Sequence, residues 1–349
     1  MNQLHQWLAV CIASQASDLH LSTGLPPLMR VHGEIRRLAE TVLKNEAIQA
    51  MLHSVMSDTL CKEFAQAWEV DFSCDMPPLG RFRVNAFHQT RGVAAVIRVI
   101  PTHIPSLIEI QAPAIVTTLL SQSSGLILVT GPTGSGKSTT LAAMVDHINS
   151  HIGGHILTVE DPVEFVHTPQ LGLVNQREVA THTHSFANAL RSALREDPDV
   201  ILVGELRDLE TIRLALTAAE TGHLVLATVH TSSAAKTVDR LIDVFPGDEK
   251  NMARAMLSES LLAVISQTLC QRQDGQGRVA AHEVMVATPA IRHLIREAKV
   301  AQMYSVIQTG QSHGMQTLDQ HLQVLLHQGQ ISFAVAQSYA RSPELLRDA

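Results

Sequence analysis

A glycine-rich stretch that lies between an apolar run and a helical pattern constrains this chain more than any other feature. It reads Gly131-Pro132-Thr133-Gly134-Ser135-Gly136-Lys137-Ser138-Thr139 and matches the pattern G-x-x-x-x-G-K-[ST]. Residues 125–130 before it predict a short buried strand, and the apolar residues after it recur at helical spacing as far as Ile148. A strand, a glycine loop and a helix start in this order predict a loop that wraps the phosphates of a nucleotide.

Each residue type in the loop has a physical role. Glycines let consecutive backbone N–H groups curl around anionic oxygens. The start of the helix adds unpaired donors and a partial positive charge. Lys137 is expected to reach the β- and γ-phosphates, and the hydroxyl of Ser138 to ligate a magnesium ion. The sequence therefore predicts a site for ATP together with Mg²⁺.

Composition narrows the class of protein. With 349 residues the chain is long enough for two domains. Its uncharged apolar runs are far shorter than the roughly 20 residues that cross a bilayer, and Met1–Gln15 lacks the features of a signal peptide, so we expect a cytoplasmic protein. A net charge of −7 and 3% aromatic residues argue against direct binding of nucleic acid. The four cysteines form no C-x-x-C pair, and this predicts neither a disulfide framework nor a zinc site.

Two domains are predicted. Residues 1–100 have the pattern of an α+β unit that ends in a hairpin, and three prolines within 101–113 indicate a linker. Strands and helices then alternate within 114–349, which predicts a mostly parallel sheet with helices on both faces. Several short helices are expected from about residue 288 onward. Strands are expected near 126–130, 156–160, 200–205 and 223–229, and helices near 137–149, 184–196, 208–221, 234–244 and 248–268.

Two carboxylates follow apolar strands, and ligands of parallel sheets bind at such carboxyl ends. Glu205 ends one run and is expected to hold Mg²⁺ through a water molecule; the alternative is a charge that caps the end of a strand. Glu160 ends another run, close to Asp161 and Glu164, and is our candidate for orienting or deprotonating the attacking water. The alternative there is a solvated acidic turn.

A histidine and several arginines are further candidates. His230 follows a third strand and is expected to sense the γ-phosphate or to contact Glu160; a structural histidine is the alternative. Arg81, Arg83 and Arg98 lie on the polar face of the N-terminal hairpin. Arginine is suited to stabilising a phosphoryl transition state, often from a separate domain. A solvated sheet face is the alternative.

Taken together, the motifs resemble those of secretion ATPases. The glycine loop, Glu160-Asp161-Pro162, Asp199–Asp208 and His223–His230 have the order and spacing of the Walker A, Asp box, Walker B and His box of that family. The segment Ala290–Glu297, AIRHLIRE, is similar to the A-I-R-x-L-I-R-E motif of the PilT family of type IV pilus retraction ATPases. The resemblance extends from about residue 17 to residue 322 and does not include the tail after Gln323.

The resemblance implies a RecA-like P-loop ATPase domain, a smaller PAS-like N-terminal domain and a hexameric ring. Glu160 is implied to be the catalytic glutamate and Glu205 the Walker B acid, with Arg81 and Arg98 reaching the nucleotide during domain closure. The implied function is ATP-driven retraction of type IV pili, which underlies twitching motility, at the cytoplasmic face of the inner membrane. The implied partners are a membrane-embedded platform protein, pilin indirectly and a paralogous retraction ATPase.

Three alternatives stay open at this point. The first is an accessory retraction ATPase that assists a dominant paralogue, the second is a related secretion or DNA-uptake motor, and the third is a catalytically silent ring. The intact residues Lys137, Ser138, Glu160 and Glu205 argue against the silent ring. The absence of C-x-x-C pairs argues against pilus-extending relatives, which carry a tetracysteine motif. The segment Ala290–Glu297 is implied to serve retraction and not ATP binding.

Overall fold

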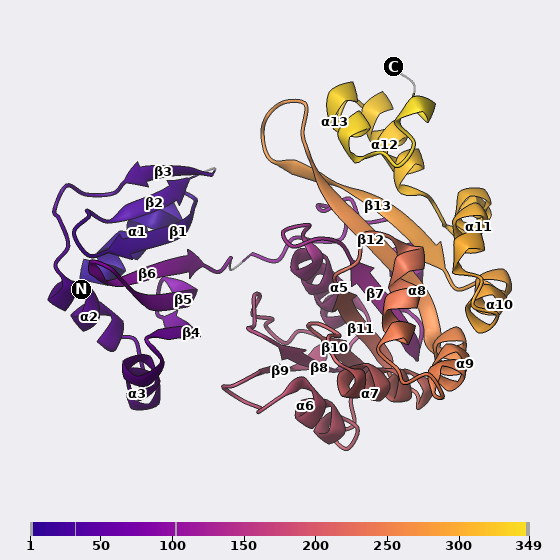
Figure 1. The fold of residues 1–349 in the computed structure, drawn as a ribbon, viewed down its shortest axis with the longest axis horizontal. Helices are drawn as coiled ribbons and strands as arrows, with labels where there is room; N and C mark the ends of the chain where they lie inside the picture. Colours follow the sequence, from indigo (N-terminus) through magenta and orange to yellow (C-terminus); the bar gives the residue numbers. More distant parts are fainter. Residues whose placement is uncertain (1–2, 32, 102, 347–349) are drawn as a thin grey trace. The chain divides into compact units, whose positions relative to one another are not determined.

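The chain divides into two compact units, Met1–His103 and Ile104–Ala349 (Figure 1). The computed structural model describes residues 3–31, 33–101 and 103–346. The described ranges leave out residues 1–2 and 32 of the predicted segment 1–100, residue 102 of the predicted segment 101–113, and residues 347–349 of the predicted segment 114–349. From Ile104 onward, the segment expected to be a linker belongs to the second unit, where Leu107 is buried in an apolar core.

Within the described part of the first unit, six strands form an antiparallel sheet in the order β3-β2-β1-β6-β5-β4. Alternation along β5 places Phe82 and Val84 in the core beneath the helices and leaves Arg81 and Arg83 on the other face. The expected α+β arrangement is confirmed, although strand β4 was not predicted. The elements are α1 (Gln3–Ala13), β1 (Ala16–Ser22), β2 (Leu28–Val31), β3 (Glu34–Arg37), α2 (Asn45–His53), α3 (Asp58–Ala67), β4 (Glu69–Met76), β5 (Gly80–Gln89) and β6 (Gly92–Val99).

The second unit is built on a larger sheet, whose described strands have the order β13-β12-β7-β11-β10-β8-β9. All pairings are parallel except that of β13 with β12. The elements are α4 (Ile115–Leu120), β7 (Gly125–Thr130), α5 (Lys137–His151), β8 (Gly154–Glu160), β9 (Gly172–Glu178), α6 (Phe186–Ala193), β10 (Val200–Val203), α7 (Leu209–Glu220), β11 (Leu224–Val229), α8 (Ala234–Asp243), α9 (Lys250–Ser260), β12 (Leu261–Gln271), β13 (Arg278–Val286), α10 (Pro289–Arg296), η1 (Val300–Gln302), α11 (Met303–Thr309), η2 (Gln311–His313), α12 (Leu318–His327), α13 (Phe333–Tyr339) and η3 (Pro343–Leu345).

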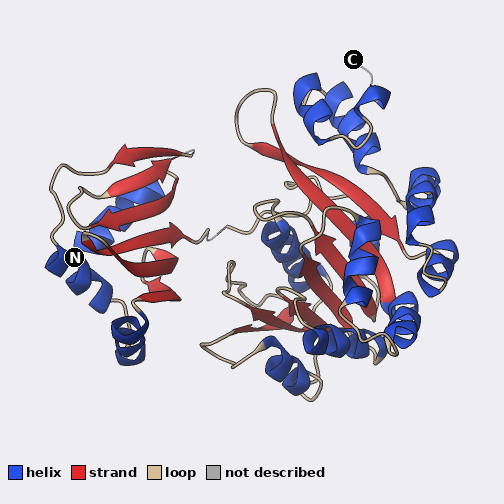
Figure 2. Ribbon diagram, viewed as in Figure 1, coloured by secondary structure: helices blue, strands red, loops and turns tan. Residues whose placement is uncertain are grey.

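The central strands of this sheet are buried on both faces. In β7, Leu126 and Leu128 pack in the core that contains α6 to α9, whereas Ile127 and Val129 pack in the core that contains α4 and α5. Figure 2 shows helices on both sides of the strands. Burial on both faces explains why these strands are continuous apolar runs without polar alternation. The α/β fold class predicted from the sequence is confirmed.

The expected helix 248–268 is wrong in its second half. Helix α9 ends at Ser260, and the chain continues directly as strand β12. Residues 261–271 are a mainly apolar run with β-branched members, and such a run fits a buried strand as well as a buried helix. Pairing with β7 and β13 decides the conformation, and those contacts are not visible in local sequence. Strands β9 and β13 were likewise not predicted.

The expected series of short helices after residue 288 is confirmed as α10 to α13. Helices α12 and α13 pack on β12 and β13 around a small apolar core of their own (Figure 1). None of the helices within the described ranges is long and apolar enough to cross a membrane.

Candidate active site

The glycine loop has the backbone geometry that a phosphate-binding loop needs. Gly131, Gly134 and Gly136 have φ angles of 147°, 76° and 87°, a region that side-chain-bearing residues rarely adopt. Helix α5 begins immediately afterwards, at Lys137, so its first N–H groups have no intrahelical partner. Pro132, Thr133 and Gly134 form the exposed outer part of the loop, and Thr139 is half-buried in the first turn of α5. The predicted strand–loop–helix context is therefore present.

Lys137 crosses the loop from the first turn of α5. Its Nζ donates hydrogen bonds to the carbonyl oxygens of Gly131 (2.9 Å) and Pro132 (3.0 Å), and the residue is 8% exposed. Burial lowers the pKa of Lys137, and the negative charges of Glu205 and Glu164 oppose that shift. The predicted Glu205 therefore lies close enough to the loop to affect its lysine, and so does Glu164, a neighbour of the predicted Glu160.

Glu205 follows strand β10 and is held by basic neighbours. Its Oε2 lies 2.6 Å from an Arg207 guanidinium nitrogen and 3.4 Å from Nε2 of His230. Burial acts to raise the pKa of Glu205, but the hydrogen bond from Arg207 and the charges of His230, Arg207 and Lys137 together lower it below its usual value. Glu205 is therefore an ionised carboxylate suited to an oxygen-preferring cation. The contact of His230 within the site is therefore with Glu205. Arg207 was not predicted as part of the site.

Glu160 ends strand β8 in a different environment. Its Oε1 accepts hydrogen bonds from the Thr158 hydroxyl (2.7 Å) and from Nε2 of Gln176 (3.1 Å). Burial raises the pKa of Glu160 even though both bonds lower it, and the negative charge of Glu164 raises it further. A carboxylate whose proton affinity is raised and whose orientation is fixed can act as a general base.

Gln176 was not predicted from the sequence, although it orients this glutamate. It lies on strand β9, where a polar residue in a short strand is expected to face solvent. Its Nε2 also donates to the carbonyl of Phe165 (2.8 Å), and its Oε1 accepts from the backbone N–H of His167 (2.8 Å). These bonds hold the amide in one orientation toward Glu160.

The strand order brings these groups to one edge of the sheet. Strands β7, β11, β10 and β8 are neighbours, and their carboxyl ends lead to the glycine loop, His230, Glu205 and Glu160 respectively. A Cβ placed on Gly204 would lie 3.3 Å from Cα of Glu160, so the ends of β10 and β8 are in close contact. Two carboxylates with opposite pKa shifts next to a lysine-bearing loop form an arrangement able to hydrolyse a phosphoanhydride.

The donor set fits a nucleotide with a magnesium ion. The loop offers backbone N–H groups and the ammonium of Lys137 to phosphate oxygens. The exposed Ser138 hydroxyl and the ionised Glu205 are the oxygen ligands that Mg²⁺ prefers.

Comparison with known proteins identifies the family. A family model described as type II/IV secretion system protein matches residues 2–338 of this chain. The chain belongs to this family. The secretion ATPase resemblance seen in the motifs is thereby confirmed.

Relatives and a solved structure place the chain within the family. The type IV pilus retraction ATPase PilT of Pseudomonas aeruginosa is 58% identical, over 97% of this chain and 98% of that protein. The type IV pilus ATPase PilU of the same organism is 39% identical, over 99% of this chain and 90% of that protein. A crystal structure of the pilus retraction motor PilT with bound ADP has a TM-score of 0.91 at 44% identity, covering 99% of this chain and 98% of that one.

The two arginines proposed from the secretion ATPase resemblance lie in the first unit and form ion pairs there. Arg81 on β5 pairs with Asp75, and Arg98 on β6 pairs with Asp18, each at 3.0 Å. Their exposure differs, because the side chain of Arg98 is 63% exposed and that of Arg81 only 16%. Asp18 is buried, so Arg98 also compensates a buried carboxylate.

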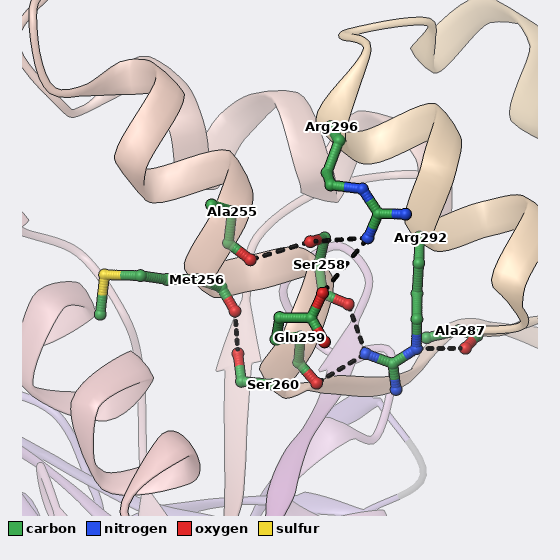
Figure 3. A network of polar contacts seen from close by, with 8 residues as sticks. All are labelled: Ala255, Met256, Ser258, Glu259, Ser260, Ala287, Arg292 and Arg296. Carbon is green, nitrogen blue, oxygen red and sulfur yellow. Dashed lines mark hydrogen bonds and ion pairs between the residues drawn. The ribbon is translucent and has the colours of Figure 1, made fainter.

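Residues 290–296 of the AIRHLIRE segment lie in helix α10, which packs against the end of α9, and Glu297 is the residue at which the helix ends (Figure 3). Its apolar residues Ile291, Leu294 and Ile295 are buried, as their helical spacing predicts. Arg292 donates from Nε to the carbonyl of Ala287 (2.9 Å) and from Nη1 to the carbonyls of Ser258 and Glu259. A cation at the last carbonyls of α9 complements the negative end of the helix dipole.

We expect Arg292→Ala to destabilise this part of the fold. The change leaves the Ser258 and Glu259 carbonyls without their charged donor, and such bonds contribute about 2 kcal/mol. In a unit of this size that corresponds to a fall in the thermal unfolding midpoint of about 5 °C. The exposed neighbour His293, changed to alanine, serves as the control and should shift the midpoint by less than about 1 °C. Equal midpoints for the two variants would contradict the assignment.

Proposed function

We propose that this chain hydrolyses ATP with Mg²⁺ and converts the free energy into retraction of type IV pili. The observation that carries the proposal is the meeting of Lys137, Glu205 and Glu160 at one edge of the second sheet. Membership of the secretion ATPase family and near full-length similarity to PilT, a pilus retraction ATPase, indicate the process that the hydrolysis drives.

Each residue has a defined task in this reaction. The loop N–H groups and Lys137 bind and neutralise the β- and γ-phosphate oxygens. Ser138 and, through water, Glu205 would hold a magnesium ion, which would supply further charge neutralisation. Glu160 accepts a proton from the attacking water, and the Thr158 and Gln176 bonds keep its carboxylate in position.

We propose that ATP hydrolysis also depends on the N-terminal domain and on further copies of the chain. We propose that six copies assemble into a ring at the cytoplasmic face of the inner membrane and act on a membrane-embedded platform protein, so that pilin subunits leave the base of the pilus. Arg81 and Arg98 would complete the charge neutralisation of the transferred phosphoryl group from the N-terminal domain. Because the side chain of Arg98 is more exposed than that of Arg81, we expect Arg98 to reach the phosphoryl group more readily.

An Arg98→Ala variant tests the arginine proposal. We expect kcat for ATP to fall about tenfold, because one of two cations that stabilise the transition state is removed while Arg81 stays. Arg83→Ala is the matched control, since Arg83 lies opposite Arg98 on the neighbouring strand β5 and also pairs with an aspartate, Asp71. The control should keep kcat within about twofold. Equal loss in both variants would assign the effect to the fold of the sheet and not to catalysis.

Two measurements test the function as a whole. Purified protein should release phosphate from ATP only when Mg²⁺ is present. In the source organism, a deletion of this gene should stop pilus retraction, and the unmodified gene should restore it. A deletion strain that still retracts its pili would favour the accessory role, in which a dominant paralogue drives retraction. The greater similarity to PilT than to PilU favours the primary role.

A further inference from the structure

A buried glutamine on β12 holds the glycine loop from the side of the sheet. Ser266 of β12 pairs with Thr130 of β7, so the following residue, Gln267, lies beside the loop that leaves β7. Gln267 is 2% exposed. Its Nε2 donates to the carbonyl of Ser135 (2.6 Å), and its Oε1 accepts from the hydroxyl of Thr140 (2.9 Å). One amide therefore joins the loop to the first turn of α5.

Two glycines of the loop are fitted to the same residue. A Cβ on Gly131 would lie 2.3 Å from the carbonyl oxygen of Gln267, and a Cβ on Gly136 would lie 3.2 Å from its Nε2. Real Cβ contacts are longer than the first distance, and the second is tight, so side chains at these positions would push Gln267 out of place. The shape of the loop and the position of this amide depend on each other.

The hydrogen bond to Ser135 also sets the direction of a phosphate-binding donor. In a trans peptide the carbonyl and the next N–H point in opposite directions. Because Gln267 holds the Ser135 carbonyl toward β12, the N–H of Gly136 points away from β12. Rotation of this peptide would instead turn a carbonyl oxygen toward the phosphates, which would repel them.

We propose that Gln267 is a positioning residue for nucleotide phosphates: it fixes the Ser135–Gly136 peptide so that its N–H faces the β-phosphate. The role rests on the proposed nucleotide binding and adds to it a residue outside the four ATPase motifs. Gln267 does not touch the reacting atoms, so its removal should weaken binding more than it slows the chemical step.

A Gln267→Met variant, which keeps the length of the side chain, tests this role. We expect the Kd for a fluorescent ADP analogue and the KM for ATP to rise about tenfold, as for the loss of one buried hydrogen bond. The value of kcat should change less than about threefold, because Glu160 and Glu205 keep their contacts. The thermal unfolding midpoint is measured without nucleotide, so that a loss of fold is recognised.

Two further variants distinguish the two hydrogen bonds of the Gln267 amide, one to Ser135 and one to Thr140. Gln267→Glu keeps the size and the acceptor for Thr140 but places a carboxylate against the Ser135 carbonyl, so ADP binding should weaken at least as much as in Gln267→Met. If Gln267→Met does not fold, the ADP affinity of Gln267→Glu tests the positioning role. Thr140→Val keeps the bond to Ser135 and should leave the ADP Kd within about twofold.

The outcomes distinguish this role from the proposed function. ADP binding by both Gln267 variants within about twofold of the unchanged protein would overturn the positioning role alone. The same holds if Thr140→Val weakens ADP binding as much as Gln267→Met does. Unchanged protein that fails to bind the ADP analogue would overturn the proposed function and this role together.

Discussion

Lys137→Ala is expected to fold normally and to lose ATP turnover by at least about 10³-fold. In the proposed mechanism Lys137 is the cation directed at the β- and γ-phosphates, where it neutralises the charge of the transition state. The bonds that it now makes, to the Gly131 and Pro132 carbonyls, stay within the loop, and Lys137 is not part of the apolar cores on either face of the sheet. Phosphate release from ATP at saturating Mg²⁺ is the measurement.

The control for this variant is another lysine at a helix start. Lys236 is exposed in the first turn of α8, and Lys236→Ala should keep the rate of phosphate release within about twofold. Circular dichroism and the thermal unfolding midpoint establish that both variants fold. A Lys137→Ala protein that retains more than about a tenth of the normal rate would contradict the assigned role of the loop.

The parts of the site that lie at strand ends were predictable from the sequence. Lys137, Glu205 and Glu160 each follow an apolar strand, and a parallel sheet brings the carboxyl ends of its strands to one edge. Local patterns are sufficient in such a case because the geometry of the sheet supplies the long-range contacts. The alternating β5–β6 hairpin was predictable for a similar reason, since its strands are neighbours in the chain.

The residues that orient the site were not predictable. Gln176 and Gln267 lie within strands, where a polar residue normally indicates a solvent-facing position. Their partners lie on other segments: Gln267 contacts Ser135, which is 132 positions earlier in the chain, and Gln176 contacts Glu160 on the neighbouring strand. The burial of Gln267, the partial burial of Gln176 and the hydrogen bonds of both amides depend on the complete sheet. The same dependence on non-local pairing explains why β12 was taken for helix.

The electrostatic difference between the two acids was also not visible in the sequence. Both glutamates follow apolar strands, yet basic neighbours lower the pKa of Glu205, whereas burial raises the pKa of Glu160. The first is thereby suited to a cation and the second to a proton. Arg207 and Glu164, which strengthen this difference, are short-range neighbours whose side-chain directions only the structure provides.

Glu160→Gln should separate nucleotide binding from hydrolysis. Glutamine keeps the size of the side chain and an oxygen that can accept the bond from Thr158, but it does not take a proton from water. We expect kcat to fall by about 10³-fold, within the range for loss of a general base, while the Kd for the ADP analogue stays within about threefold. Hydrolysis at more than about a tenth of the normal rate would contradict the assignment of Glu160 as the base.

The pH dependence provides an independent check on the same residue. The base works only when deprotonated, so kcat of the unchanged protein should fall as the pH decreases through the raised pKa of Glu160. The negative charge of the exposed Glu164 contributes to that shift, and Glu164→Gln should therefore lower the pKa of Glu160. The acid limb of the profile should then move to lower pH while the rate at neutral pH is kept. In Glu160→Gln the residual rate should lose this limb altogether, because the carboxylate assigned as the base is replaced by an amide that does not titrate. An acid limb that stays in place in both variants would assign the titration to another group.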